Sequence, residues 1–186
     1  MRPSAPVARR YAKALYGLAR EAGHPEPVAD ELERFAGLLE SEHELREVLT
    51  WPWVKATAKR SLVVAVAERL ELSPLTRRFL ALVAQRRRLA LLPEIVAAYR
   101  GLVDEAAGRV RARVRTAVAL ADGDRAALRE GLGRRLGRAV LLETEVDPTL
   151  VGGFVVEVGS QMLDASIGGR LRALRDVLTK GAGGAA

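Results

Sequence analysis

The chain has 186 residues, of which 49% are apolar and only 4% aromatic, and its formal net charge is +7. The absence of cysteine excludes disulfides, thiolate metal sites and a cysteine nucleophile, and no apolar run is long enough to predict a membrane-spanning helix. Because Ala, Leu and Val supply most of the apolar content, the composition favours helices around a core of small aliphatic side chains.

Residues 4–105 follow a helical period throughout, with apolar side chains recurring every three or four positions in six segments. The first segment ends near Ala22, just before Gly23. The fifth begins at Ser73-Pro74, where serine can cap the helix and proline in the first turn loses no hydrogen bond. The sequence therefore predicts a bundle of six amphipathic helices joined by short loops.

The period changes at Arg109, where charged and small residues begin to alternate and predict a strand with one solvated face. The other elements expected are a helix from Asp122, strands over 140–146 and 154–158, and a last helix capped by Ser166. We place the domain boundary near residues 106–108. The predicted class is α+β, with a six-helix bundle over residues 1–105 and a small α/β domain, containing a short sheet and two helices, over residues 106–186.

Four arginines share one face of the predicted strand: Arg109, Arg111, Arg113 and Arg115. This face could bind a partner, be a solvated sheet surface, or protect a sheet edge with charge. Together with the run 86–88, it also allows a second function, a basic nucleic-acid-binding module. Against that alternative, the net positive charge is divided almost evenly between residues 1–105 and 106–186, and no basic tail or stacking aromatics accompany it.

The sequence contains no recognisable motif for catalysis. No phosphate-binding Gly-x-x-x-x-Gly-Lys-Ser/Thr is present, and no Gly-x-Gly-x-x-Gly follows a strand. His24 and His43 have no second metal ligand at a suitable spacing. Asp147 and Asp164 stand where turns and helix starts use Asp to bind local backbone N–H groups. We expect a non-catalytic protein without cofactor or metal.

The most distinctive stretch covers residues 146–174. It combines an Asp-Pro turn, a glycine pair, a short apolar strand, a second reversal and a capped helix, through Asp147, Pro148, Gly152, Gly153, Gly159, Asp164, Ser166 and Gly169. This stretch resembles the C-terminal signature of the delta subunit of F-type ATP synthases, the family of the mitochondrial oligomycin-sensitivity-conferring protein. Residues 8–15 resemble the family's opening helix and residues 88–95 its mid-chain pattern.

The resemblance implies a stator subunit of the peripheral stalk. Such a subunit links the catalytic head to the membrane-anchored b stalk and resists rotor torque during proton-driven ATP synthesis. Its helical domain grips N-terminal segments of alpha subunits, and its C-terminal domain meets the b stalk. The implied location is the cytoplasmic face of a bacterial inner membrane, where it associates with the membrane only through the complex. No small-molecule ligand or nucleic acid is implied.

Candidate contacts follow from that role. For the alpha-subunit helix, the candidate groove residues are Tyr11, Ala14, Leu15, Leu18, Arg78, Phe79, Leu82 and Arg86. Among them, we expect Leu15, Leu18 and Phe79 to face the core, and Tyr11, Arg78, Leu82 and Arg86 to share an outward edge. For the b stalk, we expect a basic face drawn from Arg109, Arg111, Arg113, Arg115, Arg172 and Arg175. The eight signature residues named above are expected to be architectural, because glycine pairs more often serve turns and close backbone packing than ligand binding.

Overall fold

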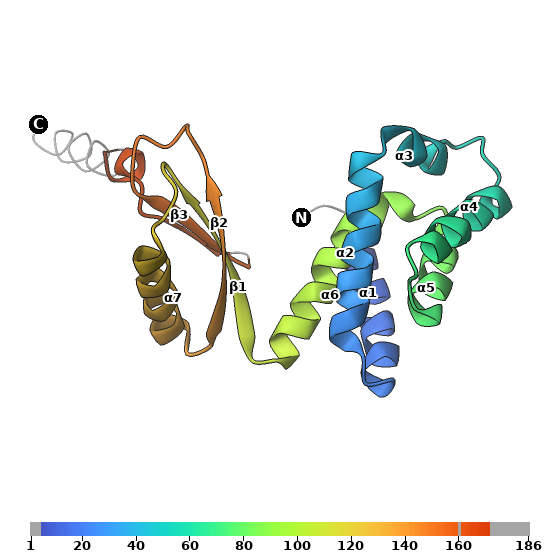
Figure 1. The fold of residues 1–186 in the computed structure, drawn as a ribbon, viewed down its shortest axis with the longest axis horizontal. Coiled ribbons are helices and arrows are strands. Elements are labelled where there is room, and N and C mark those ends of the chain that lie inside the picture. The colour runs from blue at the N-terminus through green and yellow to red at the C-terminus, as the bar shows by residue number, and fades with distance from the viewer. Residues whose placement is uncertain (1–4, 160, 172–186) are drawn as a thin grey trace, which may run out of the picture. The chain divides into compact units, whose positions relative to one another are not determined.

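In the computed structural model of the chain, residues 5–159 and 161–171 are described. Their contacts divide the chain into two units, with the division between Ala106 and Ala107. The first unit is helical, and the second combines a mixed sheet with helices (Figure 1). The predicted α+β class is therefore confirmed.

The helical unit contains α1 (Ala5–Glu21), α2 (Pro25–Ser41), α3 (His43–Thr50), α4 (Ala56–Arg69), α5 (Pro74–Gln85), the short 3-10 helix η1 (Leu89–Leu91) and α6 (Leu92–Ala106). Helices α1 and α2 both pack on α6, and α4 packs on α5 (Figure 1). The helix η1 was not expected from the sequence. It continues directly into α6, which begins at Leu92 rather than at Pro93.

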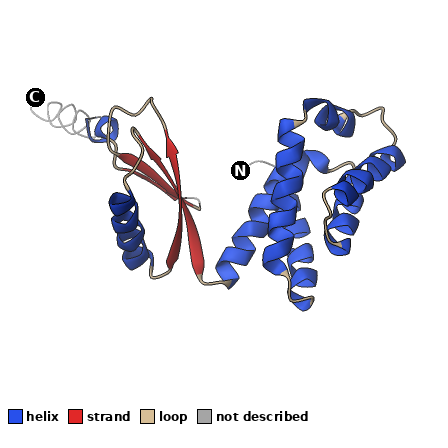
Figure 2. Ribbon diagram, viewed as in Figure 1, coloured by secondary structure: helices blue, strands red, loops and turns tan. Residues whose placement is uncertain are grey.

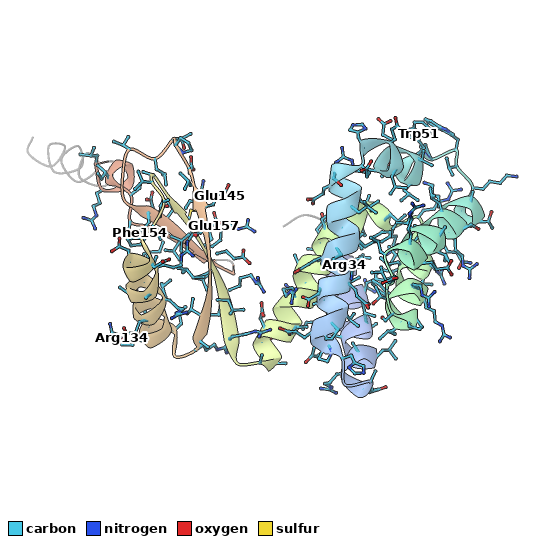
Figure 3. The ribbon with its side chains drawn as sticks, viewed as in Figure 1. Arg34, Trp51, Arg134, Glu145, Phe154 and Glu157 are labelled. Carbon is cyan, nitrogen blue, oxygen red and sulfur yellow. The ribbon has the colours of Figure 1, made fainter. Side chains whose placement is uncertain are left out.

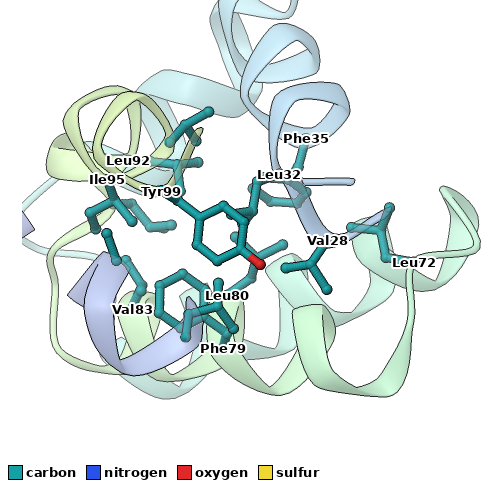
Figure 4. Close-up of a cluster of buried hydrophobic side chains, with 14 of the residues drawn as sticks. Val28, Leu32, Phe35, Leu72, Phe79, Leu80, Val83, Leu92, Ile95 and Tyr99 are labelled. Carbon is teal, nitrogen blue, oxygen red and sulfur yellow. The ribbon is translucent and has the colours of Figure 1, made fainter. Parts of the chain in front are cut away.

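The core of this unit surrounds Tyr99 of α6, whose side chain is completely buried among Leu32, Phe35, Leu80 and Ile95 (Figure 4). Its hydroxyl donates a hydrogen bond to the backbone oxygen of Pro25, at 3.0 Å. A buried phenol needs such a partner, because an unpaired polar group in a core is costly. Burial also raises the pKa of Tyr99. The bond joins the last helix of the unit to the start of α2.

A second polar link ties α2 to α5. Ser73 caps α5 as expected, accepting from the Thr76 amide at 3.4 Å. The carboxylate of Glu31 accepts hydrogen bonds from the Ser73 amide at 2.9 Å and the Ser73 hydroxyl at 2.7 Å, and also from the hydroxyl of Thr76. Glu31 therefore fixes the position of the first turn of α5 against α2.

The second unit contains β1 (Arg109–Thr116), α7 (Asp122–Leu136), β2 (Ala139–Val146), β3 (Phe154–Val158) and β4 (Gln161–Asp164), and a further helix begins at Ile167. The sheet order is β2-β1-β3-β4. Strands β1 and β2 are parallel, and the other two pairs are antiparallel. Strand β4 was not expected; the sequence suggested only a reversal there.

Helix α7 is the crossover that parallel strands require, and it covers one face of the sheet (Figure 2). Its Leu132 joins Ala112, Val114, Val140 and Val156 in a small core. Strand β1 lies between β2 and β3. The possibility that β1 is an edge strand protected by its charges is therefore wrong, because both sides of its backbone are paired.

Candidate partner-binding sites

A groove of about 550 Å³ lies between α1 and α5. Its floor is apolar, formed by the buried side chains of Leu15 and Phe79. Leu18 and Leu82 border it with 54% and 44% of their surfaces exposed. Large apolar residues exposed beside an apolar hollow are typical of a surface that a partner covers. We call this surface the α1/α5 groove.

The helical repeat of α1 explains how the groove arises. Ala8, Ala12, Leu15 and Ala19 share the buried face, at spacings of three and four residues. Tyr11 and Leu18 lie seven positions apart and therefore share the neighbouring face. The Tyr11 ring meets Phe79 edge-on, with 6.3 Å between the ring centroids, and the Arg88 guanidinium lies 5.8 Å from the Tyr11 ring centroid. These contacts hold Tyr11 in place at the groove.

The structure brings together seven of the eight residues proposed for the alpha-subunit helix: Tyr11, Ala14, Leu15, Leu18, Arg78, Phe79 and Leu82 all line the groove. Arg86 does not line it; this residue follows the end of α5 at Gln85. Leu18 is exposed, so the expectation that it faces the core is wrong for this residue. Arg10 and Leu75 also line the groove and were missed. Helical spacing could have found Leu75, which lies one turn before Arg78 and Phe79.

The arginines of β1 stand opposite acidic residues of the flanking strands. In the strand register, Arg113 faces Glu143 of β2 on one side and Glu157 of β3 on the other, and Arg115 faces Glu145. Figure 3 labels two of these acidic residues, Glu145 and Glu157. Because directly opposed residues point to the same face of a sheet, these charged side chains share one face. No arrangement of this kind was visible before the strands were paired.

Ion pairs form on this face of the sheet, most of them between residues that are not directly opposed. Arg111 pairs with Glu143, and Arg115 pairs with Asp147 at 3.1 Å and Glu157 at 3.7 Å. Arg113 is the most exposed of the three, at 60% of its side chain, and lies 3.9 Å from Glu143. The basic face proposed for the b stalk is therefore largely neutralised by its own sheet. Arg172 and Arg175, which were proposed for the same face, lie outside the described residues.

The Asp-Pro turn of the signature stretch is a local hydrogen-bonded unit. The Leu150 amide donates to the Asp147 backbone oxygen at 3.1 Å, which closes a turn with Pro148 in its second position. The Asp147 carboxylate accepts from the Thr149 amide at 3.0 Å and from the Thr149 hydroxyl at 2.6 Å. These two bonds, with a smaller effect of Arg115, lower the pKa of Asp147.

The glycine pair lies against the segment that precedes the last described helix. The Gly152 backbone oxygen accepts from the Ile167 amide at 2.9 Å. Gly153 has a φ of +79°, and a Cβ at this position would lie 2.5 Å from the backbone oxygen of Ala165. A side chain at Gly153 is thus excluded by both backbone conformation and space. At Gly152, a Cβ would meet only the end of the Ile167 side chain, at 2.7 Å.

Asp164, Ser166 and Gly169 form the start of the helix. The Asp164 carboxylate accepts from the Ser166 amide at 2.9 Å and from its hydroxyl at 2.6 Å. The Ser166 hydroxyl in turn accepts from the Gly169 amide at 2.9 Å, which is the expected cap. A Cβ on Gly169 would lie 2.5 Å from the Asp164 carboxylate. Gly159 provides a turn with a φ of +60°. All of these contacts lie within the unit.

The family model for the ATP synthase delta (OSCP) subunit matches residues 7–178, which is nearly the whole chain. The chain belongs to this family. Among its relatives are the ATP synthase subunits delta of Solidesulfovibrio magneticus, 40% identical over 94% of this chain and 97% of that protein, and of Paracoccus denitrificans, 36% identical over 94% and 93%. Both alignments span nearly the full length of each protein.

A solved structure shares the fold. A chain of the Toxoplasma gondii mitochondrial ATP synthase hexamer matches with a TM-score of 0.74 at 21% identity, over 92% of this chain and 97% of that one.

Membership of the delta (OSCP) family confirms the predicted ATP synthase subunit over the nucleic-acid-binding alternative. It also confirms the prediction of a non-catalytic subunit. Within the described residues, no helix combines the length and apolar character needed to cross a membrane.

Proposed function

We propose that the chain is the peripheral-stalk subunit that joins the catalytic head of an F-type ATP synthase to the membrane-anchored b stalk. Family membership supports the complex, and the α1/α5 groove supports the kind of contact. A stator must stay attached while the rotor applies torque. A helix buried in an apolar groove suits this task, because apolar burial weakens little with salt and gives slow dissociation.

We propose that the six α-helices act together as one bundle, formed by residues 1–105, that grips the head. The occupant of the α1/α5 groove is the N-terminal segment of an alpha subunit, bound as an amphipathic helix. Tyr11 is the main anchor, since its ring is held by Phe79 and Arg88 before the partner arrives. Aromatic side chains held in place in this way are common hot spots.

We propose that residues 106–186 meet the b stalk. Arg109, Arg111, Arg113 and Arg115, with Arg172 and Arg175, remain the candidates for a polar contact, although the ion pairs on the sheet reduce the charge they offer. Met162 and Leu163 add exposed apolar surface beside α7, around a cavity of about 320 Å³. Apolar contacts there would hold the complex, while exposed charge pairs would contribute about 0–1 kcal/mol each. The location that follows is the cytoplasmic face of a bacterial inner membrane.

The groove is tested by calorimetry with a synthetic peptide of the alpha-subunit N-terminus from the same genome. Tyr11→Ala should weaken binding by about 1–3 kcal/mol, the usual range for an interface hot spot. Trp53→Ala is the matched control, because Trp53 is an aromatic residue of the same unit that is 72% exposed and lies away from the groove. Unchanged affinity of a folded Tyr11→Ala protein would remove the α1/α5 groove as the alpha-subunit site.

A further inference from the structure

The charges of the helical unit are strongly segregated. Residues 55–88, which include α4 and α5, hold nine Lys or Arg and two Glu, whereas residues 25–50 hold eight Asp or Glu and two Arg. Helix α1 adds four Lys or Arg and one Glu. The two helices that form the α1/α5 groove therefore both belong to the positive part of the unit. Only Arg10 and Arg78 carry charge among the residues that line the groove.

A second cavity, of about 500 Å³, lies between α4 and α5; we call it the α4/α5 pocket. Arg78 and Leu82 line both cavities, so the two lie on either side of one ridge of α5. The α4/α5 pocket is more polar than the groove and is lined by Arg60, Arg77 and Arg78, with Glu68 as its one acidic residue. Three positive charges therefore stand immediately beside an apolar groove.

The guanidinium group of Arg77 has hydrogen-bonding capacity that its contacts leave unused. Its Nε is buried and has no hydrogen-bond partner within the part of the chain that the structure describes. Its Nη1 lies 3.5 Å from the Glu68 carboxylate, at the limit of a hydrogen bond, and Glu68 is itself 57% exposed. The Arg77 side chain is 34% exposed, so a partner carboxylate can reach its guanidinium and gain both a hydrogen bond and a charge interaction.

We infer that the α1/α5 groove and the α4/α5 pocket form one surface that selects an acidic amphipathic helix. The apolar face of the helix fills the groove. Carboxylates on the adjoining face reach across the α5 ridge to Arg78, Arg77 and Arg60. An amphipathic helix carries both faces side by side, since residues three and four apart line one face and their neighbours the next. This inference rests on the proposed function and adds the charge of the partner.

The groove itself argues against nucleic acid as the occupant. Leu15, Leu18, Phe79 and Leu82 give it an apolar surface, which phosphate backbones do not fill. Glu68 places a negative charge among the three arginines of the pocket. This charge would repel a row of phosphates more than it would repel a single carboxylate. Complementary charge of this kind raises association rates and excludes wrong partners.

The test uses three synthetic 18-residue helical peptides with the same stripe of Leu and Ile and with Glu, Gln or Lys on the adjoining face. Binding to the full chain is followed by fluorescence anisotropy at 50 and 500 mM NaCl. We expect the Glu peptide to bind tightest and the Lys peptide weakest, with about a three- to tenfold loss at each step at low salt. High salt should reduce the difference, because it screens exposed charges.

Variants of the pocket arginines test whether these residues cause the preference for the Glu peptide. Arg60→Gln and Arg77→Gln should each weaken the Glu peptide by about threefold and leave the Gln peptide unchanged. Arg69→Gln is the matched control, since Arg69 is exposed in the last turn of α4 and lines neither cavity. The inference is overturned if the Glu and Lys peptides bind alike, or if Arg69→Gln weakens binding as much as the other two variants. It is also overturned if a DNA duplex displaces the Glu peptide at an equal concentration.

The alpha-subunit peptide separates this inference from the proposed function. If it binds in a Tyr11-dependent way that neither salt nor Arg77→Gln alters, the function stands and the charge selection is wrong. If it fails to bind while the designed Glu peptide shows the expected dependence, the surface selects acidic helices, but the alpha subunit is not its partner.

Discussion

Replacing Gly153 by Ala tests whether the signature glycines are architectural. At a φ of +79°, an L-residue carries about 1–2 kcal/mol of backbone strain. The new Cβ would also lie 2.5 Å from the Ala165 backbone oxygen and 2.9 Å from the Ser166 Cα. Because backbone must move to relieve these contacts, we add about 1–3 kcal/mol, the usual cost of overpacking. We therefore expect Gly153→Ala to lower the free energy of unfolding of residues 107–186 by about 2–5 kcal/mol.

Substitutions at two neighbouring glycines separate the cost of backbone strain from the cost of the close Cβ contact. Gly159 has a φ of +60° but nothing within 4 Å of a built Cβ, so Gly159→Ala should cost only the strain, about 1–2 kcal/mol. Gly152 would meet only the Cδ1 and Cγ1 atoms of Ile167. That side chain can rotate away, so Gly152→Ala should cost no more than about 1.5 kcal/mol.

The assay is hydrogen–deuterium exchange of peptides covering β1 and β3 in a urea series on the full chain. Fluorescence provides an internal control, since the two tryptophans, Trp51 and Trp53, both lie in the helical unit and should report an unchanged midpoint. Should Gly153→Ala prove no more destabilising than Gly159→Ala, the close approach to Ala165 does not constrain the fold and our reasoning is wrong. Loss of b-stalk binding at full stability would instead make the glycine pair a contact site.

Two further predictions concern carboxylates. Glu31→Ala should lower the stability of the helical unit by about 2–3 kcal/mol in urea unfolding, because the Ser73 amide and hydroxyl and the Thr76 hydroxyl lose their acceptor; a cost equal to that of the exposed Glu40→Ala would contradict this. The folded-state pKa of Asp147 is lowered below its ordinary value of 3.8. The stabilisation that ionised Asp147 gives the folded state is therefore present above that pH and is lost as the pH falls through the folded-state pKa. Asp147→Asn should flatten this part of the acid dependence of residues 107–186, and identical acid profiles for the two proteins would refute it.

Several features could be predicted because they depend on near neighbours in the chain. The cap of α5 at Ser73 and the start of the last helix at Ser166 involve bonds that span three residues. The groove residues of α1 were accessible for the same reason, since a helix of known period must place Tyr11 and Leu18 on one face. That Leu18 faces solvent and not the core was not accessible, because it depends on how closely α5 approaches α1.

The amino-acid sequence by itself determined the helical and extended periods, the change between them at Arg109, and a signature stretch specific enough to indicate the family. Tertiary structure decided which charges meet. Alternating arginines predict a strand, but only the pairing of β1 with β2 and β3 shows that Glu143 and Glu157 stand beside them. Likewise, Glu31 and Ser73 are 42 positions apart, and their contact exists only because α2 packs beside α5. Local patterns follow from backbone geometry, whereas these contacts depend on which of many packings buries the apolar surface best.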